Sequence, residues 1–283
     1  MNSPQIAIVT GVSSGIGFFL ANYLANHDFI VYGILRNEVK FQKNMEQYQF
    51  SRKENLHIVP MDVRNFTKTK ELINQIYFKH NRIDVLVNNA GYGLYGPLEE
   101  LDEKEIRDQF ETNFFAPMVW IKLVLPIMRN QQSGKIINIA SILGRVTIPT
   151  GSAYCSAKHA LVALSEALRY EVSPFGIQVC SVEPGLVRTD FKDNMKLSAE
   201  IDHKTSPYYK LNQKIKQQLG RYPNYATSAE TAAKKIMNLI QRENLPPHYL
   251  IGVDAGFYLN LKNLLPEGVW DFVLKTFTKS VMK

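Results

Sequence analysis

Short runs of largely apolar residues alternate with segments of helical periodicity along most of this chain. The runs are rich in β-branched residues and occupy residues 6–10, 29–35, 56–61, 84–88, 135–140, 178–183 and 249–253. The helical patterns between them cover residues 18–26, 71–80, 104–128, 153–173 and 228–242. Strands that are apolar at nearly every position are buried on both faces, which is typical of a parallel sheet between two layers of helices. The sequence therefore predicts an α/β fold with one doubly wound parallel sheet and helices on both faces.

The composition agrees with a globular chain and restricts its partners. At 45% hydrophobic and 21% charged residues the chain can bury a full core, which excludes the disordered and fibrous classes. Its net charge is 33 − 26 = +7, and residues 191–283, with 14 Lys and Arg against 8 Asp and Glu, carry +6 of it. We interpret this charge as a solvated surface, with an anionic substrate or a membrane surface as the alternative. Nucleic acid is excluded as a partner because no Lys- and Arg-dense stretch with interleaved aromatic residues is present.

The two cysteines, Cys155 and Cys180, are too few to crosslink a fold of this size. The spacing of the cysteines and of the six histidines matches no metal-binding motif, so we expect no metal. The N-terminus lacks a basic stretch followed by a long apolar one, and no apolar run approaches the ~18 residues of a membrane-spanning helix. These observations predict a cytoplasmic protein in a reducing compartment.

The regular alternation weakens after residue 190. Residues 191–225 are rich in Lys, Gln, Asn and Tyr, and we expect them to form a flexible lid over the substrate. Residues 255–283 are expected to form a C-terminal helical extension. Residues 1–283 are therefore expected to form a single domain that carries this lid and extension.

An apolar stripe in the C-terminal extension consists of Trp270, Leu274, Phe277 and Val281, which lie on one face of a helix. We interpret this stripe as part of the core or of an interface. Docking to a membrane surface is the less favoured alternative, suggested by four nearby lysines: Lys262, Lys275, Lys279 and Lys283.

A glycine turn with the pattern G-x-x-x-G-x-G lies between the first predicted strand and the first predicted helix. Its glycines are Gly11, Gly15 and Gly17, and the residues between them include Ser13, Ser14 and Ile16. Glycines permit a tight turn and let a pyrophosphate approach the helix N-terminus, where free N–H groups and the helix dipole favour anions. The turn therefore predicts a Rossmann-like dinucleotide site.

The same residues, 11–15, also match the G-x-S-x-G pattern of the nucleophile elbow of hydrolases. A hydrolase builds much of its sheet and half of its oxyanion hole upstream of that serine. Only 12 residues precede Ser13, so we reject this alternative.

The end of the second predicted strand bears on the choice of cofactor. An acidic residue about 20 residues after the glycine turn selects NAD by binding the ribose 2′-hydroxyl. Here Leu35 occupies that place and Arg36 follows it. A guanidinium pairs well with a 2′-phosphate, so the sequence predicts NADP as the cofactor.

Four polar residues form a candidate acid–base group. Tyr154 and Lys158 are four residues apart and lie one turn apart on the same face of a predicted helix. A nearby ammonium stabilises a phenolate, so we expect Lys158 to lower the pKa of Tyr154 from its ordinary value near ~10. Ser141 follows a predicted strand at the edge where ligands bind in such folds. Asn113 interrupts a long helical pattern, where its amide can bend the helix or relay a proton through water.

Taken together, these motifs resemble the short-chain dehydrogenase/reductase family over essentially the whole chain. The residues that carry the resemblance are Thr10, Gly11, Gly15, Ile16, Gly17, Asp62, Val63, Asn88, Asn89, Ala90, Gly91, Asn113, Ser141, Tyr154, Lys158, Pro184, Gly185 and Thr189. The resemblance implies that Tyr154 is the general acid/base and that Lys158 lowers its pKa while holding the nicotinamide ribose. It also implies that Ser141 orients the substrate oxygen and that Asn113 supports the proton relay.

For the cofactor, the resemblance implies an adenine site at Asp62 and Val63 and a central wall at residues 89–91. The nicotinamide end is implied to contact the segment that contains Pro184, Gly185, Val187 and Thr189. Within the family, residues 89–97 and the Leu35–Arg36 pair resemble the hydroxysteroid and retinol dehydrogenase branch.

The expected substrate pocket has one polar point, formed by Ser141 and Tyr154. Ser141, Leu143, Ile148 and Tyr154 are the residues we expect to contact substrate. The walls are expected to be largely apolar, with contributions from Leu94, Tyr95, Leu143, Ile148, Pro149 and Leu186. Such a pocket favours a lipophilic ketone, aldehyde or alcohol, of the steroid, retinoid or lipid kind, over a sugar.

We therefore predict an NADP(H)-dependent oxidoreductase that acts on a carbonyl/secondary-alcohol pair, in the reductive direction, and forms a homo-oligomer (dimer or tetramer). The alternative is a non-catalytic dinucleotide-binding sensor or scaffold with the same fold. A sensor has no need of Ser141, Tyr154, Lys158 and Asn113 together, which favours the enzyme.

Overall fold

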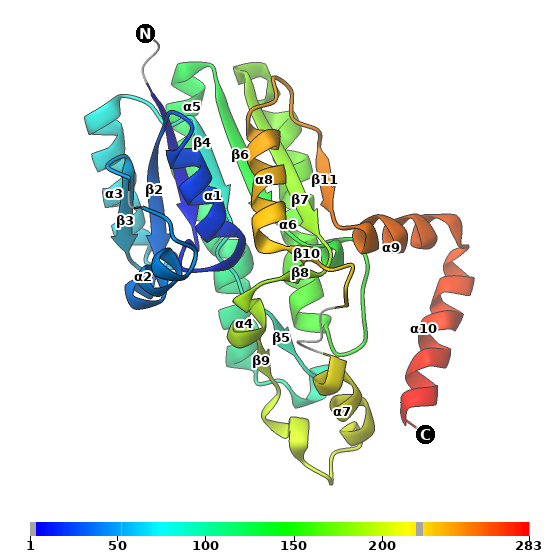
Figure 1. Ribbon diagram of the computed structural model, residues 1–283. Coiled ribbons are helices and arrows are strands. Elements are labelled where there is room, and N and C mark those ends of the chain that lie inside the picture. Colours follow the sequence, from blue (N-terminus) through cyan, green and yellow to red (C-terminus); the bar gives the residue numbers. More distant parts are fainter. Residues whose placement is uncertain (1–3, 52, 219–222, 283) are drawn as a thin grey trace.

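Seven parallel strands form the central sheet of the computed structural model, which describes residues 4–51, 53–218 and 223–282 (Figure 1). The strand order is β11-β7-β6-β4-β1-β2-β3. The bounds are β1 (Gln5–Thr10), β2 (Phe29–Leu35), β3 (Leu56–Pro60), β4 (Val85–Asn88), β6 (Gly134–Ile139), β7 (Ile177–Pro184) and β11 (His248–Ile251). The order reverses between β1 and β4, and ligands bind beyond the carboxyl ends of the strands at such a reversal.

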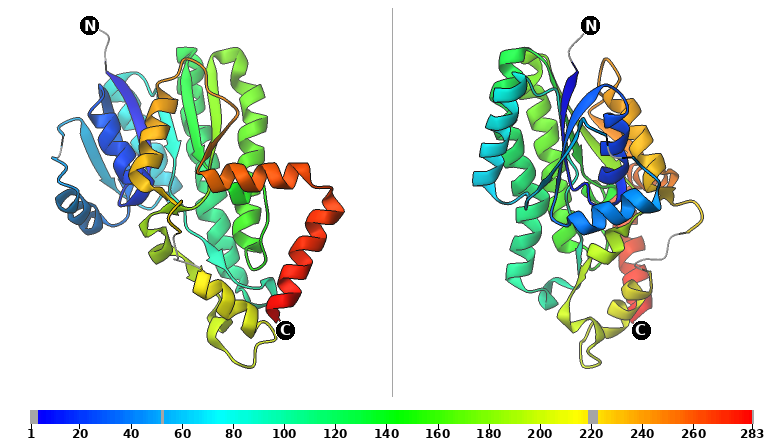
Figure 2. Two further views of the ribbon diagram at one scale, coloured as in Figure 1. Left: turned by 45° about the vertical axis from the view of Figure 1, so that its right-hand side comes forward. Right: turned by 60° about the vertical axis from the view of Figure 1, so that its left-hand side comes forward.

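Helices cover both faces of this sheet, as predicted (Figure 2). On one face lie α1 (Gly15–Ala25), α2 (Glu38–Gln47) and α8 (Ala229–Ile240). On the other lie α3 (Phe66–His80), α5 (Ala116–Gln131) and α6 (Ser152–Val172). The side chains of β1 alternate between the two cores, with Ala7 and Val9 in the first and Ile6 and Ile8 in the second. This alternation explains why the strand sequences are apolar without interruption. Helix α2 was not predicted.

The long helical pattern at 104–128 is divided by a π turn, Glu111–Phe115, which separates α4 (Glu103–Phe110) from α5. Pro117 lies in the first turn of α5, where its missing N–H costs nothing. The break is at Asn113, inside the π turn, and such turns are frequent at functional sites.

The segment that we expected to be a flexible lid is folded in its described part. It contains β9 (Lys196–Leu197), which pairs with β5 (Leu94–Tyr95), and α7 (Tyr209–Gln218). These residues therefore form regular secondary structure, and their role as a lid stays a prediction. Residues 219–222 of that segment, and Lys283 of the tail, lie outside the described residues.

Glu100 anchors this segment to the rest of the molecule. It lies in the 3-10 turn Leu98–Glu100, before α4. Its backbone carbonyl accepts a hydrogen bond from Ser198 Oγ (2.8 Å), and its carboxylate accepts hydrogen bonds from Asn212 Nδ2 (2.9 Å) and Ser206 Oγ. Glu100 thus holds three points along the segment, one through its backbone carbonyl and two through its carboxylate.

Two further helices end the chain, α9 (Val253–Leu264) and α10 (Glu267–Met282). Helix α9 leads away from the sheet, and α10 turns back and packs against α7 (Figures 1 and 2). We predicted that the last strand would reach residue 253, but β11 ends at Ile251 because Gly252 adopts a positive φ of 107°. In the described part of the chain, no helix combines the length and the apolar content needed to span a bilayer.

Candidate active site

The glycine turn joins β1 to α1 at the strand reversal. Gly11 (φ 74°) and Gly15 (φ 63°) adopt backbone conformations that favour glycine. Gly17 is buried, and a Cβ there would lie 2.4 Å from Nδ2 of Asn89. We predicted that Gly17 contacts the cofactor. In the structure it instead lets α1 pack closely against the turn and against Asn89.

Thr10 and Asn89 hold the end of β4 against this turn. Thr10 Oγ1 accepts hydrogen bonds from the backbone N–H groups of Asn89 (2.9 Å) and Ala90 (3.0 Å). Asn89 Nδ2 donates to the backbone oxygens of Thr10 (2.8 Å) and Gly11 (3.1 Å). These bonds position the turn independently of any ligand.

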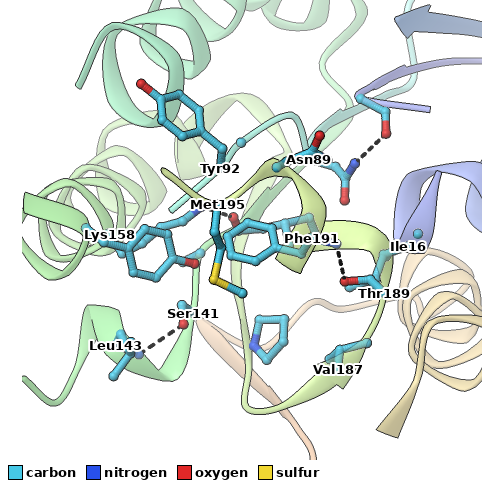
Figure 3. Close-up of a pocket in the computed structure, with 18 of the residues that line it drawn as sticks. Ile16, Asn89, Tyr92, Ser141, Leu143, Lys158, Val187, Thr189, Phe191 and Met195 are labelled. Atoms are coloured by element: carbon cyan, nitrogen blue, oxygen red, sulfur yellow. Dashed lines mark hydrogen bonds between the residues drawn. The ribbon is translucent and has the colours of Figure 1, made fainter. Parts of the chain in front are cut away.

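One cavity of about 1230 Å³ is lined by residues from the glycine turn through to the C-terminal helices. Figure 3 shows part of this lining. The volume of the cavity exceeds the roughly 300–1,000 Å³ of a typical site for a single small ligand. Almost all predicted cofactor residues line it: Gly11, Ser13, Ser14, Gly15, Ile16, Arg36, Asp62, Val63, Asn89, Ala90, Gly91, Tyr154, Lys158, Pro184, Gly185, Val187 and Thr189. The structure therefore brings together residues from segments far apart in the sequence.

Cationic side chains gather where β2 and β3 end. The side chain of Arg36 is 66% exposed and lies 4.0 Å from Asp62 Oδ2, a weak contact that leaves the guanidinium accessible. Asp62 pairs more closely with Arg64 (2.9 Å), and this hydrogen bond lowers the pKa of the Asp62 carboxyl. Lys40 and Arg64 also line the cavity, and sequence analysis did not identify either residue. Lys40 is four residues from Arg36 in the chain, whereas only the tertiary structure brings Arg64 to the Asp62 carboxylate that Arg36 also approaches.

Ser141 and Tyr154 form the polar point of the cavity. Ser141 caps a 3-10 turn by accepting a hydrogen bond from Leu143 N (3.1 Å), and it also hydrogen-bonds to the Tyr154 hydroxyl. Burial raises the pKa of Tyr154 above its ordinary value, and the hydrogen bond with Ser141 opposes this effect. The two hydroxyls are thus joined and largely shielded from water.

Lys158 lies beside Tyr154 but is held by the backbone. Its Nζ donates to the Ile139 carbonyl (2.8 Å) and lies 5.8 Å from the centroid of the Tyr154 ring. Burial lowers the pKa of Lys158 to about 8 because desolvation disfavours the ammonium. We expected Lys158 to lower the pKa of Tyr154; in this structure burial has the larger effect and the pKa is raised.

Both polar groups of the Asn113 side chain are engaged by the backbone of Tyr92. Nδ2 donates to the Tyr92 carbonyl (2.7 Å), and Oδ1 accepts from the Tyr92 N–H (3.2 Å). A Cβ at Gly91 would lie 2.7 Å from Asn113 Oδ1 and 3.7 Å from Lys158 Nζ, so Asn113 lies close to the acid–base group. Its side chain positions the 91–92 backbone.

Asp254, in the first turn of α9, reaches the loop that follows β7. Its Oδ2 accepts a hydrogen bond from Leu186 N (2.6 Å), and it occupies the space that a Cβ at Gly185 would need. The C-terminal extension is therefore connected to the cavity wall at Pro184–Leu186. No motif in the sequence marks Asp254, which is a lone carboxylate directly after the last predicted strand.

Most of the apolar side chains that we expected around the polar point line the cavity. Tyr95, Leu143, Ile148 and Leu186 line the cavity as expected. Leu94 and Pro149 are not among the described residues that line the cavity. Leu94 is instead buried in a separate cluster with Leu101 and Ala153.

Two residues of the expected lid, Phe191 and Met195, project into the cavity from the segment that follows Thr189 (Figure 3). The centroid of the Tyr154 ring lies 6.0 Å from that of the Phe191 ring and 5.6 Å from that of the Tyr95 ring. Sequence analysis identified the segment but neither residue, because the segment has no periodicity to assign their direction.

The short-chain dehydrogenase family model matches residues 5–200. A 3-ketodihydrosphingosine reductase of Bacteroides thetaiotaomicron is 35% identical, over 97% of this chain and 98% of that enzyme. Among solved structures, a short-chain dehydrogenase from Streptomyces avermitilis superposes with a TM-score of 0.81 at 31% identity, over 99% of this chain and 96% of that one.

A second solved structure, ElxO with NADP bound, is similar with a TM-score of 0.71 at 27% identity, over 87% of this chain and 96% of that one. NAD(P) is the cofactor typical of this family. The family match covers the glycine turn, the cationic end of the cavity and the Ser141–Tyr154–Lys158 group. With the seven-stranded sheet and relatives that align over nearly its full length, the chain belongs to the short-chain dehydrogenase/reductase family of oxidoreductases.

Proposed function

We propose that this chain transfers a hydride between NADP(H) and the carbonyl/secondary-alcohol pair of a lipophilic substrate. The observation that carries the proposal is the arrangement of the cavity. The acid–base group of Ser141, Tyr154 and Lys158 lies on one wall, and the cations Arg36 and Lys40 lie at one end. The reductive direction stays a prediction.

The residues of the cavity fit a dinucleotide. The turn at Gly11–Gly15 offers backbone N–H groups and the N-terminus of α1 to a pyrophosphate. The accessible Arg36 guanidinium, with Lys40 and Arg64 nearby, supports a preference for a 2′-phosphate and hence for NADP. A bound nicotinamide supplies the hydride.

The chain's own residues handle one proton. Ser141 holds the substrate oxygen by a hydrogen bond, and Tyr154 donates a proton to that oxygen, or accepts one in the reverse direction. The Lys158 ammonium, with a pKa of about 8, is mostly charged at pH 7 and favours the phenolate form of Tyr154 when that proton leaves. Asn113 holds the neighbouring backbone through both polar groups of its side chain, and its part in a proton relay stays a prediction.

The substrate walls support a lipophilic ketone. Tyr95, Leu143, Ile148 and Phe191 surround the polar point. One relative, the B. thetaiotaomicron reductase, is named for a keto substrate. The resemblance to the hydroxysteroid and retinol dehydrogenase branch stays a prediction, as do the single domain, the cytoplasmic location and the homo-oligomer.

The test is NADPH oxidation, followed by absorbance, with a homologous series of ketones and with 3-ketodihydrosphingosine. We expect turnover that increases with chain length, since each buried methylene contributes about 0.8 kcal/mol. A kcat/KM that stays flat or falls with chain length contradicts the lipophilic pocket. Binding of NADPH without turnover of any carbonyl compound favours the non-catalytic sensor instead.

A further inference from the structure

The cavity continues past the acid–base group to the C-terminal helices. Trp270 and Leu274 of α10 line this far end, and both are partly buried. Residues four apart lie on one face of a helix, about 6 Å apart along its axis. These two side chains therefore form a stripe along α10 that faces the cavity.

Helix α7 supplies the opposite wall. Ile215, on the buried side of α7, lines the same end of the cavity, and α7 packs against α10. Tyr258 of α9 and Met195 also line the cavity. We call these five residues (Met195, Ile215, Tyr258, Trp270 and Leu274) the tail slot. All five are apolar or aromatic, so the slot suits a hydrocarbon.

The opposite side of α10 differs in its surroundings. Phe272 is 68% exposed and Val273 is 47% exposed, and neither lines the described cavity. Trp270 and Leu274 thus face the cavity, whereas Phe272 and Val273 of the same helix face away from it. This difference provides matched control positions.

We infer that the tail slot binds the long alkyl or acyl chain of an amphiphilic substrate whose carbonyl lies at Ser141 and Tyr154. Trp270 and Leu274 are the specificity-determining residues for chain length. The position of the carbonyl rests on the proposed function, whereas binding of a chain in the slot does not. An extended chain suits two apolar residues stacked along a helix, because it contacts both at once.

A fluorescence titration tests the slot without any reaction. The chain has two tryptophans, and Trp120 is fully buried in the core, with its Nε1 donating to the Val63 carbonyl (3.3 Å). Trp270 is therefore the tryptophan that meets a ligand in the slot. We expect 2-undecanone to produce a saturable blue shift of emission and 2-butanone to produce none.

The variants sharpen this titration. Trp270→Phe should abolish the blue shift, and Leu274→Ala should weaken 2-undecanone binding about tenfold. Phe272→Ala should change neither the shift nor the affinity. A titration that is the same in the Leu274→Ala and Phe272→Ala proteins, or no saturable shift in the wild type, overturns the inference.

Kinetics separate the two proposals. The ratio of kcat/KM for 2-undecanone to that for 2-butanone should fall about tenfold in Leu274→Ala and stay unchanged in Phe272→Ala. If ketones are reduced but this ratio is the same in both variants, the slot is wrong and the proposed function stands. If the titration behaves as expected and no ketone is reduced, the slot stands and the proposed reaction is wrong.

Discussion

The sheet and the C-terminal helices are stabilised in different ways. In the sheet, strands and helices bury large apolar side chains on both faces, among them Trp120 and Phe18, which are fully buried. Helix α10 has no buried residue, and its exposed side chains include Phe272 and Phe277. The first 190 residues carry a net charge of 19 − 18 = +1, and the rest carry +6. The glycine turn and the acid–base group thus lie on a close-packed support, whereas the far end of the cavity is lined by α10, a helix with few buried contacts that is easier to vary.

The largest expected effect is on catalysis at the acid–base group. Tyr154→Phe removes the hydroxyl that bonds to Ser141 and leaves the buried ring in place, so kcat should fall by ~10²–10⁴-fold. Tyr170→Phe, on the same helix but 76% exposed, is the control and should keep the wild-type rate. A Tyr154→Phe enzyme that retains more than about a tenth of wild-type turnover contradicts the role of Tyr154.

The difference in packing predicts a difference in stability. Trp120→Ala should lower the free energy of unfolding by about 3–5 kcal/mol because it leaves a cavity in a close-packed core. Phe272→Ala on α10 should change it by less than about 0.5 kcal/mol. Urea unfolding measures both. Equal losses for the two variants would mean that α10 is part of the main core.

Cofactor preference gives a smaller, tenfold effect. We expect kcat/KM for NADPH to be at least about tenfold higher than that for NADH, which corresponds to ~1.4 kcal/mol. The Arg36→Ala substitution should remove most of this preference. Leu35→Asp should move the preference toward NADH because the introduced carboxylate can accept a hydrogen bond from the ribose 2′-hydroxyl of that cofactor. Lys43→Ala, an exposed lysine of α2 outside the described cavity lining, is the control. Equal kcat/KM for the two cofactors in the wild type would show that Arg36 does not select between them.

The pH dependence gives the smallest effect near neutral pH. The Lys158 ammonium is present below its pKa of about 8 and is lost as the pH rises through that value. The pH dependence of kcat/KM for NADPH reports the ionisation of groups in the free enzyme. We therefore expect kcat/KM to be constant below pH 8 and to fall above it, as Lys158 loses its charge. A profile that stays level well above pH 8 would mean that the charge on Lys158 is not required.

The sequence predicted the sheet well and the substrate end poorly, for physical reasons. A strand buried on both faces must be apolar throughout, so β1 and β2 were evident. The acid–base group was also evident, since Tyr154 and Lys158 lie one turn apart on one helix. Helix α2 was missed because its buried residues are few in a polar segment.

Residues that owe their place to tertiary contacts were beyond the reach of a local pattern. Arg64 joins Arg36 only when β2 and β3 pair. Phe191 and Met195 point into the cavity from a segment without periodicity. The raised pKa of Tyr154 depends on how deeply the fold buries it, which spacing along one helix does not reveal.

Glu100 has a consequence for exchanging substrate specificity between relatives. It belongs to the turn before α4, about ninety residues before the segment that it anchors through Ser198, Ser206 and Asn212. In a recombinant chain that received only residues 191–283 from a relative, the hydrogen-bond donors would come from the relative, whereas the acceptor, Glu100, would come from this chain. The exchangeable unit is therefore discontinuous: it consists of the C-terminal segment together with the 98–100 turn, and a crossover that separates them leaves the carboxylate of Glu100 without its partners in that segment.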